Sequence, residues 1–161
     1  MNHYQKSFIV KTNPEKVYAA ITTIEGLRDW WTHESRGETG AGGTIHFNFG
    51  NTHKEMRVEL LKPNSEVRWL CKVAYIDHSE FTHKDEWVGT EIIFRLTPDG
   101  KDQTRVDFDH IGLVPTFECY EACKKGWDYF LDSLQAFAET GRGTPYESGE
   151  NCAEKIAMGS N

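Results

Sequence analysis

The hydrophobic residues near the C-terminus recur every three or four positions, which is the spacing of one face of an α-helix. Thr116 is the predicted N-cap, and Gly141 follows shortly after the predicted last residue, Glu139. The pattern therefore predicts a helix from Thr116 to Glu139, about 36 Å long at the helical rise per residue. Its apolar stripe needs a broad partner surface and consists of Phe117, Tyr120, Cys123, Trp127, Phe130, Leu131, Leu134, Phe137 and Ala138.

The N-terminal part of the chain predicts a strand followed by two short helices. The strand covers His3 to Lys11, where hydrophobic and polar residues alternate. Asn13 and Pro14 are typical of an N-cap and a first helical residue. The second helix is expected to start after Gly26 and to run through the pair Trp30 and Trp31. Adjacent helical residues are about 100° apart, so one of these rings is expected to point away from the shared face, near a cavity mouth or toward a partner.

Between residues 44 and 111 the hydrophobic period changes to two, which predicts five strands joined by turns. With the first strand they make six. Such one-sided alternation is typical of an antiparallel sheet with one wet and one dry face, which the C-terminal helix would cover in an α+β fold. The predicted inward residues are Ile45, Phe47, Phe49, Met56, Val58, Leu60, Val67, Trp69, Cys71, Ile92, Phe94, Leu96, Val106, Phe108 and His110.

The composition indicates one domain with a hydrophobic core. The chain has 161 residues, of which 38% are hydrophobic. A net charge of -7 without a basic cluster argues against nucleic acid as a partner. No cationic leader or run of about 18 apolar residues is present, so we expect a cytoplasmic protein without a membrane span. We expect the domain to cover residues 1–145 and the tail, residues 146–161, to be partly mobile.

The sequence contains no familiar enzyme motif. It lacks the GxSxG of serine hydrolases, the GxxxxGK[ST] phosphate loop and a GxGxxG after a strand. Cys119 and Cys123 lie one helical turn apart, but the acidic Glu118 and Glu121 beside them should raise the thiol pKa and disfavour a nucleophile. No two cysteines form a CxxC pair, which favours reduced thiols at Cys71, Cys119, Cys123 and Cys152.

The polar segment from Asp77 to Glu86 is the one candidate for metal binding. It holds His78 and His83 among four carboxylates, and zinc accepts both imidazole and carboxylate ligands. The spacing matches no metal motif, so a solvated loop is favoured over a zinc site and neither a metal nor a cofactor is predicted. A loop of this length can also act as a lid over a cavity.

Four stretches in this order resemble a known family: ITTIEGLRDWW, WVGTEIIFRL, TRVDFDHIGL and GWDYFLDSLQAFAETGRGTP. They are similar to the homologues of the activator of the heat shock protein 90 ATPase, within the START-like, Bet v 1-like (SRPBCC) superfamily. The resemblance covers roughly residues 4 to 145. It implies a helix-grip fold, in which a curved antiparallel sheet wraps the terminal helix and often leaves a cavity between them. Members of the superfamily bind lipids, sterols, polyketides and other apolar molecules, and a minority are enzymes.

His110 is the first candidate for a ligand contact, because an imidazole at an inward position needs a partner or a polar ligand atom. The alternative is a core histidine bonded to Tyr120, to groups near Asp107 or to a backbone carbonyl. The large aromatic rings either pack a core or wall a ligand cavity, and both bury similar areas. The predicted ligand-binding residues are Trp30, Trp31, Phe47, Trp69, Phe108, His110, Tyr120 and Trp127.

Three functions are compatible with these observations. We favour the binding of an apolar or amphipathic small molecule between the sheet and the long helix, with His110 and Tyr120 orienting it. The second is an enzyme of the cyclase or hydrolase type that uses His110 as general acid or base, which requires a carboxylate or hydroxyl within reach of its ring. The third, implied by the family name, is a module that interacts with a chaperone in the stress response. Ligand identity and oligomeric state leave no mark in the pattern.

Overall fold

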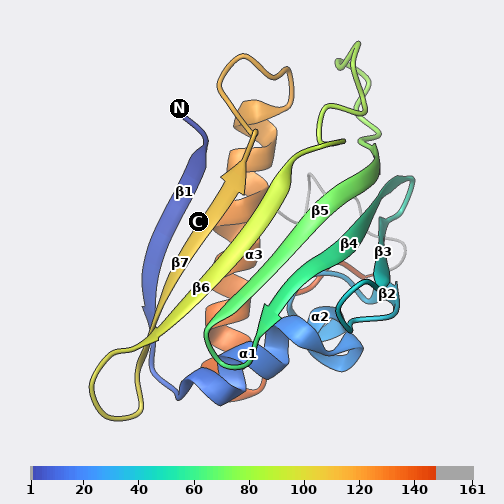
Figure 1. The fold of residues 1–161 in the computed structure, drawn as a ribbon. Helices are drawn as coiled ribbons and strands as arrows, with labels where there is room; N and C mark the ends of the chain where they lie inside the picture. Colours follow the sequence, from blue (N-terminus) through green and yellow to red (C-terminus); the bar gives the residue numbers. More distant parts are fainter. Residues whose placement is uncertain (1, 148–161) are drawn as a thin grey trace.

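Three helices and seven strands follow one another along residues 2–147, the part of the chain that the computed structural model describes (Figure 1). In order they are β1 (Tyr4–Val10), α1 (Pro14–Thr22), α2 (Ile24–Trp30), β2 (Glu34–Gly37), β3 (Thr44–Phe49), β4 (Thr52–Lys62), β5 (Glu66–Tyr75), β6 (Glu91–Pro98), β7 (Thr104–Ile111) and α3 (Tyr120–Thr140).

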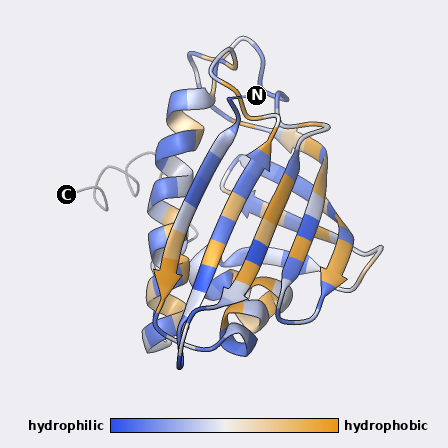
Figure 2. Ribbon diagram, turned by 60° about the vertical axis from the view of Figure 1, so that its left-hand side comes forward, coloured by the Kyte–Doolittle hydropathy of each residue, from blue (hydrophilic) through white to orange (hydrophobic). Residues whose placement is uncertain are grey.

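The seven strands form one antiparallel sheet in the order β1-β7-β6-β5-β4-β3-β2. The first strand, β1, pairs with the last strand, β7, from Tyr4↔His110 to Val10↔Thr104. All three helices lie on one face of the sheet, with α3 running along it and α1 and α2 across one end (Figure 1). Hydrophilic and hydrophobic residues alternate along the strands (Figure 2), as the sequence predicts for a sheet with one wet face.

The first helix begins at the residue that its sequence predicts, but the second begins at Ile24, before its predicted start after Gly26. The Asn13 side chain accepts a hydrogen bond of 2.9 Å from the Lys16 N–H, and Pro14 is the first residue of α1. The Thr23 hydroxyl caps α2 by accepting from the Gly26 N–H at 3.0 Å. These caps satisfy backbone donors that would otherwise have no partner inside the helix.

The α+β class, the two short helices and the long terminal helix are confirmed, but the strand count of six is wrong. The sheet has seven strands among the described residues, because β2 pairs with β3 from Glu34↔Asn48 to Gly37↔Ile45. A four-residue strand is too short to establish an alternating pattern, and this one contains charged residues and a glycine.

The predicted start of the long helix at Thr116 is also wrong. The helix begins at Tyr120 with Cys119 as an N-cap whose side chain makes no cap hydrogen bond. Residues before it form turns instead, in which the Phe117 N–H donates to the Val114 carbonyl and the Tyr120 N–H to the Phe117 carbonyl. The stripe of apolar residues therefore continues one turn beyond the helix itself.

A bulge in β4 changes which leucine faces the core. Val58 pairs with Trp69, and the register shifts between Val58 and Leu60, so that the next pairs are Leu60↔Arg68 and Leu61↔Val67. The extra residue moves Leu60 to the outer side and packs Leu61 against the core, which corrects the predicted inward position of Leu60.

The chain after α3 turns back along α2. Gly141 ends the helix in the left-handed conformation (φ 83°), which suits a residue without a side chain. Tyr146 is buried, and its N–H donates to the Trp31 carbonyl while its carbonyl accepts from the His33 N–H. The rest of the predicted mobile tail, residues 148–161, lies outside the described residues. Along residues 2–147 no helix is long and apolar enough to cross a membrane.

Candidate functional site

The space between the sheet and α3 is filled by a continuous cluster of aromatic side chains. Trp31 is its centre: its ring lies 4.4 Å from Phe47, 5.1 Å from Trp127 and 6.1 Å from Trp69, measured between ring centroids. Trp127 continues the cluster to Phe108 at 4.5 Å. Seven of the eight predicted ligand residues are buried in this interior, and the eighth, Tyr120, packs against it half-buried. Their role as ligand contacts stays a prediction.

The prediction that Trp30 or Trp31 points away from the core is wrong. Both residues are buried, and their rings stack at 5.7 Å with an angle of 8° between the planes. The helix ends at Trp30, and Trp31 is its C-cap, so the angular spacing of a continuing helix does not apply to the pair. The Trp30 N–H donates to the Ala20 carbonyl at 2.8 Å and fixes this arrangement.

His110 is a completely buried histidine with a protein partner on each ring nitrogen. The Trp127 indole N–H donates to Nδ1 at 3.0 Å, and Nε2 lies 2.8 Å from the Thr90 hydroxyl. That hydroxyl donates to the Trp87 carbonyl at 2.6 Å. Since its proton is committed there, His110 donates from Nε2 to the Thr90 oxygen, which assigns a neutral ring with its proton on Nε2.

Burial, with a smaller contribution from the positive charge of Lys54, lowers the pKa of His110 to about 3. The imidazole is therefore neutral at every pH near neutrality. The predicted alternatives for its partners, Tyr120, groups near Asp107 or a backbone carbonyl, are replaced by Trp127 and Thr90.

Lys54 is a charged residue that the sequence analysis missed. It lies on β4, is only 8% exposed, and its ammonium sits 3.9 Å from the centroid of the Trp87 ring. The rings of Phe49, at 4.8 Å, and Trp31, at 5.9 Å, surround it further. Ammonium groups are attracted to the faces of aromatic rings, and more strongly away from water. The alternation of the strand could have indicated its inward position, because position 54 has the same parity as the predicted inward residues Met56 and Val58.

The segment between β5 and β6 closes one end of the interior by holding the start of α3. Glu118 accepts hydrogen bonds from the N–H groups of Thr82 and His83, and Glu86 accepts from the N–H groups of Glu118 and Cys119. Figure 1 shows this segment and the loop before α3 at the same end of the sheet. Of the two histidines in this segment, His78 stacks its ring on Phe81 with 4.1 Å between the ring centroids. Residues 2–147 contain no group of three or more His, Cys, Asp or Glu side chains that could hold a metal.

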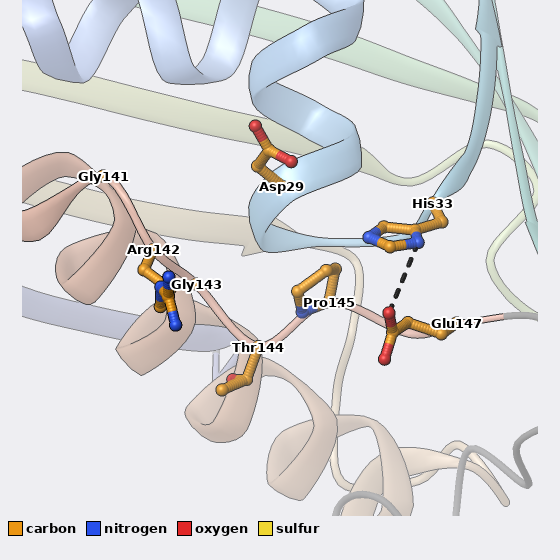
Figure 3. A pocket seen from close by; sticks show the side chains of 8 residues that line it. All are labelled: Asp29, His33, Gly141, Arg142, Gly143, Thr144, Pro145 and Glu147. Atoms are coloured by element: carbon orange, nitrogen blue, oxygen red, sulfur yellow. Dashed lines mark ion pairs between the residues drawn. The ribbon is translucent and has the colours of Figure 1, made fainter.

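A hollow of about 310 Å³ lies at the opposite end, between α2 and the residues after α3 (Figure 3). His33 Nδ1 lies 3.6 Å from a carboxylate oxygen of Glu147 at its rim. None of the predicted ligand residues lines it. Its polar walls suit water or a small polar molecule better than an apolar one, and they consist of Asp29, His33, Gly141, Arg142, Gly143, Thr144, Pro145 and Glu147.

Together these features define a helix-grip domain, with an antiparallel sheet folded against one long C-terminal helix and an aromatic interior between them. The chain belongs to the Activator of Hsp90 ATPase homolog 1-like protein family, whose model matches residues 11–139. It is similar to Aha1 from Colwellia psychrerythraea, a dimer in solution, with 35% identity over 89% of this chain and 100% of that one and a TM-score of 0.73.

Two more distant structures share the fold alone. The protein EF2215 from Enterococcus faecalis is 16% identical, with 97% of this chain and 81% of that one covered and a TM-score of 0.66. CalU16 from Micromonospora echinospora is 18% identical, with 96% and 80% covered and a TM-score of 0.63. No curated protein matches the chain significantly.

Proposed function

We propose that this chain binds a small amphipathic molecule with an anionic group, between the sheet and α3, with Lys54 holding the anion. The observation that supports this most directly is the position of the Lys54 ammonium, 8% exposed and facing three aromatic rings. An ammonium in such surroundings attracts an anion with little screening by water or salt. A carboxylate attracts an ammonium more strongly than the face of an aromatic ring does, so an acidic ligand would gain a strong contact with Lys54.

The rings around Lys54 suit the apolar part of such a ligand. Each square ångström of hydrocarbon removed from water contributes about 25 cal/mol. Trp31, Phe47, Trp69 and Trp127 would form the wall, in keeping with the role that the sequence predicts for them. Because these rings already touch one another, the ligand must displace some of them as it binds.

The ligand would pass between the start of α3 and the segment from Ile76 to Thr90. These two parts are held together by hydrogen bonds to the Glu118 and Glu86 carboxylates, most of them at the surface. Each such bond contributes only about 1 to 3 kcal/mol net, so separating them costs far less than unfolding the sheet. The Lys54 ammonium and the Trp87 ring that it contacts lie at this same end of the fold.

Thermal unfolding with paired ligands tests the proposal. Each fatty acid or aromatic carboxylic acid would be compared with its methyl ester at the same concentration, about one hundred times the dissociation constant of the acid, where binding of the acid adds about 2.7 kcal/mol of stability. We expect the acids, and not the esters, to raise the melting temperature by several degrees. Lys54→Met should abolish the preference for acids, whereas Lys72→Met, at an exposed lysine of β5, should keep it. Equal shifts for acids and esters in the wild type would contradict the proposal.

Catalysis by His110 is less well supported. The enzyme hypothesis requires a hydroxyl or carboxylate near the ring, and the Thr90 hydroxyl is within reach. Both ring nitrogens, however, are occupied by Trp127 and Thr90, and the low pKa keeps the ring from holding a proton for transfer near pH 7. The chaperone hypothesis rests on the family name, and burial of Trp30 and Trp31 removes the exposed ring that would have carried it.

A further inference from the structure

Two cysteines meet across the first turn of α3. Cys119 is the N-cap and Cys123 lies one turn later, and the Cys123 N–H donates to the Cys119 carbonyl at 2.7 Å. Both thiols are free. Residues four apart in a helix have Cα atoms about 6 Å from each other, which lies inside the range of roughly 4.4 to 6.8 Å that a disulfide spans. The Cβ atoms at this spacing are about 5 to 6 Å apart, and a disulfide needs roughly 3.5 to 4.5 Å, so joining the two sulfurs requires the backbone of the first turn, at the N-cap, to shift.

The surroundings of the two sulfurs have opposite polarity. The Trp87 indole N–H donates to the Cys123 sulfur at 3.2 Å, and the Lys54 ammonium lies over that same indole. The Glu86 carboxylate instead lies near Cys119 and accepts a hydrogen bond of 3.1 Å from its backbone N–H. A negative sulfur is thus favoured at Cys123 and disfavoured at Cys119.

The pKa values of the two thiols shift accordingly. A hydrogen bond from the Cys119 thiol lowers the pKa of Cys123, and Lys54 and Trp87 lower it further, against the opposing effects of burial and of the Glu86 charge. The same hydrogen bond raises the pKa of Cys119, together with burial and Glu86. The expectation that Glu118 would disfavour a thiolate is wrong for Cys123, because the Glu118 carboxylate faces the N–H groups of Thr82 and His83 instead.

We propose that Cys119 and Cys123 form a peroxide-reactive dithiol, in which Cys123 is the attacking thiolate and Cys119 the resolving thiol. Cys123 is partly buried and Cys119 completely buried, so we expect hydrogen peroxide to meet Cys123 first, whereas Cys119 needs to meet only its neighbour. This inference does not depend on the proposed ligand, because it rests on the geometry at the start of α3.

The chemistry proceeds in two steps. The Cys123 thiolate attacks one peroxide oxygen, an S–O bond forms, the O–O bond breaks and hydroxide leaves, which produces a sulfenic acid. The Cys119 sulfur then attacks the Cys123 sulfur, an S–S bond forms, and the sulfenic oxygen leaves as water. The Cys119 proton leaves with the sulfenic oxygen in that water, and the hydroxide of the first step takes up the proton that Cys123 released to solvent when it became a thiolate. The two thiols together supply the two electrons that reduce one peroxide to two waters.

Intact-mass and peptide mass spectrometry after treatment with hydrogen peroxide at pH 7 test the proposal. The measurements would use the wild type and a Cys152→Ser background. We expect loss of two hydrogens, restored by dithiothreitol, and a peptide pair joined through Cys119 and Cys123. Cys119→Ser should stop at a Cys123 sulfenic acid that dimedone captures, and Cys123→Ser should not form the disulfide. Cys71→Ser should behave as the wild type, because burial raises the pKa of Cys71 to about 11.

The charge arrangement has its own test, which a structural role of the thiols would not influence. The rate of Cys123 alkylation by iodoacetamide at pH 7 should fall several-fold in Lys54→Met and in Trp87→Phe, and stay unchanged in Lys72→Met. Melting curves of each variant show whether it is folded. The proposal is overturned if peroxide leaves both cysteines reduced in the folded wild type, if the disulfide involves Cys71, or if Cys119 is the residue oxidised first.

Discussion

Two polar side chains share the aromatic interior, and their surroundings give them different roles. His110 has a partner on each ring nitrogen, so it joins β7 to α3 through Trp127 and to the segment before β6 through Thr90. Lys54 faces the rings of Trp87, Phe49 and Trp31. The first is a structural hydrogen-bond bridge, and the second is the proposed contact for the anion of an acidic ligand.

The bridge made by His110 predicts a pH dependence of stability. Its pKa is about 3 in the folded state and 6.5 in the unfolded chain, so below pH 6.5 the unfolded chain takes up a proton that the folded one refuses. Stability from this residue is thus complete above pH 6.5 and falls by up to about 1.4 kcal/mol per pH unit as pH decreases toward 3.

His110→Gln should remove this pH-dependent contribution to the free energy of unfolding. We expect it to cost about 1 to 3 kcal/mol at pH 7, with the deficit shrinking at pH 6 and pH 5, as measured by urea unfolding. His83→Gln, at an exposed histidine, is the control and should parallel the wild type. Stability curves of His110→Gln and wild type that stay parallel from pH 7 to pH 5 would contradict a neutral, buried imidazole.

Single residues of the site differed in how well the sequence could predict them. The inward position of His110 follows from strict alternation in β7, and Lys54 follows from the same rule in β4, where its charge concealed it. The partners of His110 and the polarity at Cys123 could not be predicted. Trp87 and Lys54 come from other elements, and local charges such as Glu118 gave the wrong sign for the Cys123 pKa.

At the scale of elements, the corner between α1 and α2 positions the tryptophan pair. The Ala20 carbonyl accepts the Trp30 indole N–H, and Gly26 packs against the same stretch of backbone. A Cβ atom at residue 26 would lie 2.5 Å from the Ala20 oxygen. Close approach of the two helices at this point therefore requires a residue without a side chain.

Gly26→Ala should push the two helices apart and disturb Trp30. We expect a loss of about 1 to 3 kcal/mol in the free energy of unfolding, typical of overpacking, together with a changed tryptophan fluorescence spectrum. Gly40→Ala is the matched control, because a Cβ there meets no atom within 4 Å. Equal stability of the two variants would show that the corner is not closely packed.

Long periodic elements were predictable, and short or irregular ones were not. The three helices and the strands from β3 to β7 follow from the hydrophobic period. The short strand β2 and the bulge that moves Leu60 outward depend on pairing with a neighbouring strand, which no local pattern records. The N-terminus of α3 was placed too early because Phe117 continues the helical stripe into the turns before it.

At the scale of the molecule, the two ends of the interior differ in chemistry. One end holds Lys54, Trp87 and the two cysteines beneath a segment attached to α3 by carboxylate hydrogen bonds. The other is closed by the α1–α2 corner and by Tyr146, with a polar hollow outside it. We expect an amphipathic ligand to lie with its anion at the first end and its hydrocarbon among the rings of Trp31 and Trp127.

Photo-crosslinking with a fatty acid that carries a diazirine on its chain tests this placement most directly. The account predicts adducts on peptides that contain Trp31, Trp87 or Trp127, competed by excess unlabelled acid but not by its methyl ester, and reduced in Lys54→Met. Adducts confined to residues 141–147 around the polar hollow, or adducts that excess acid does not compete, would contradict a ligand site between the sheet and α3.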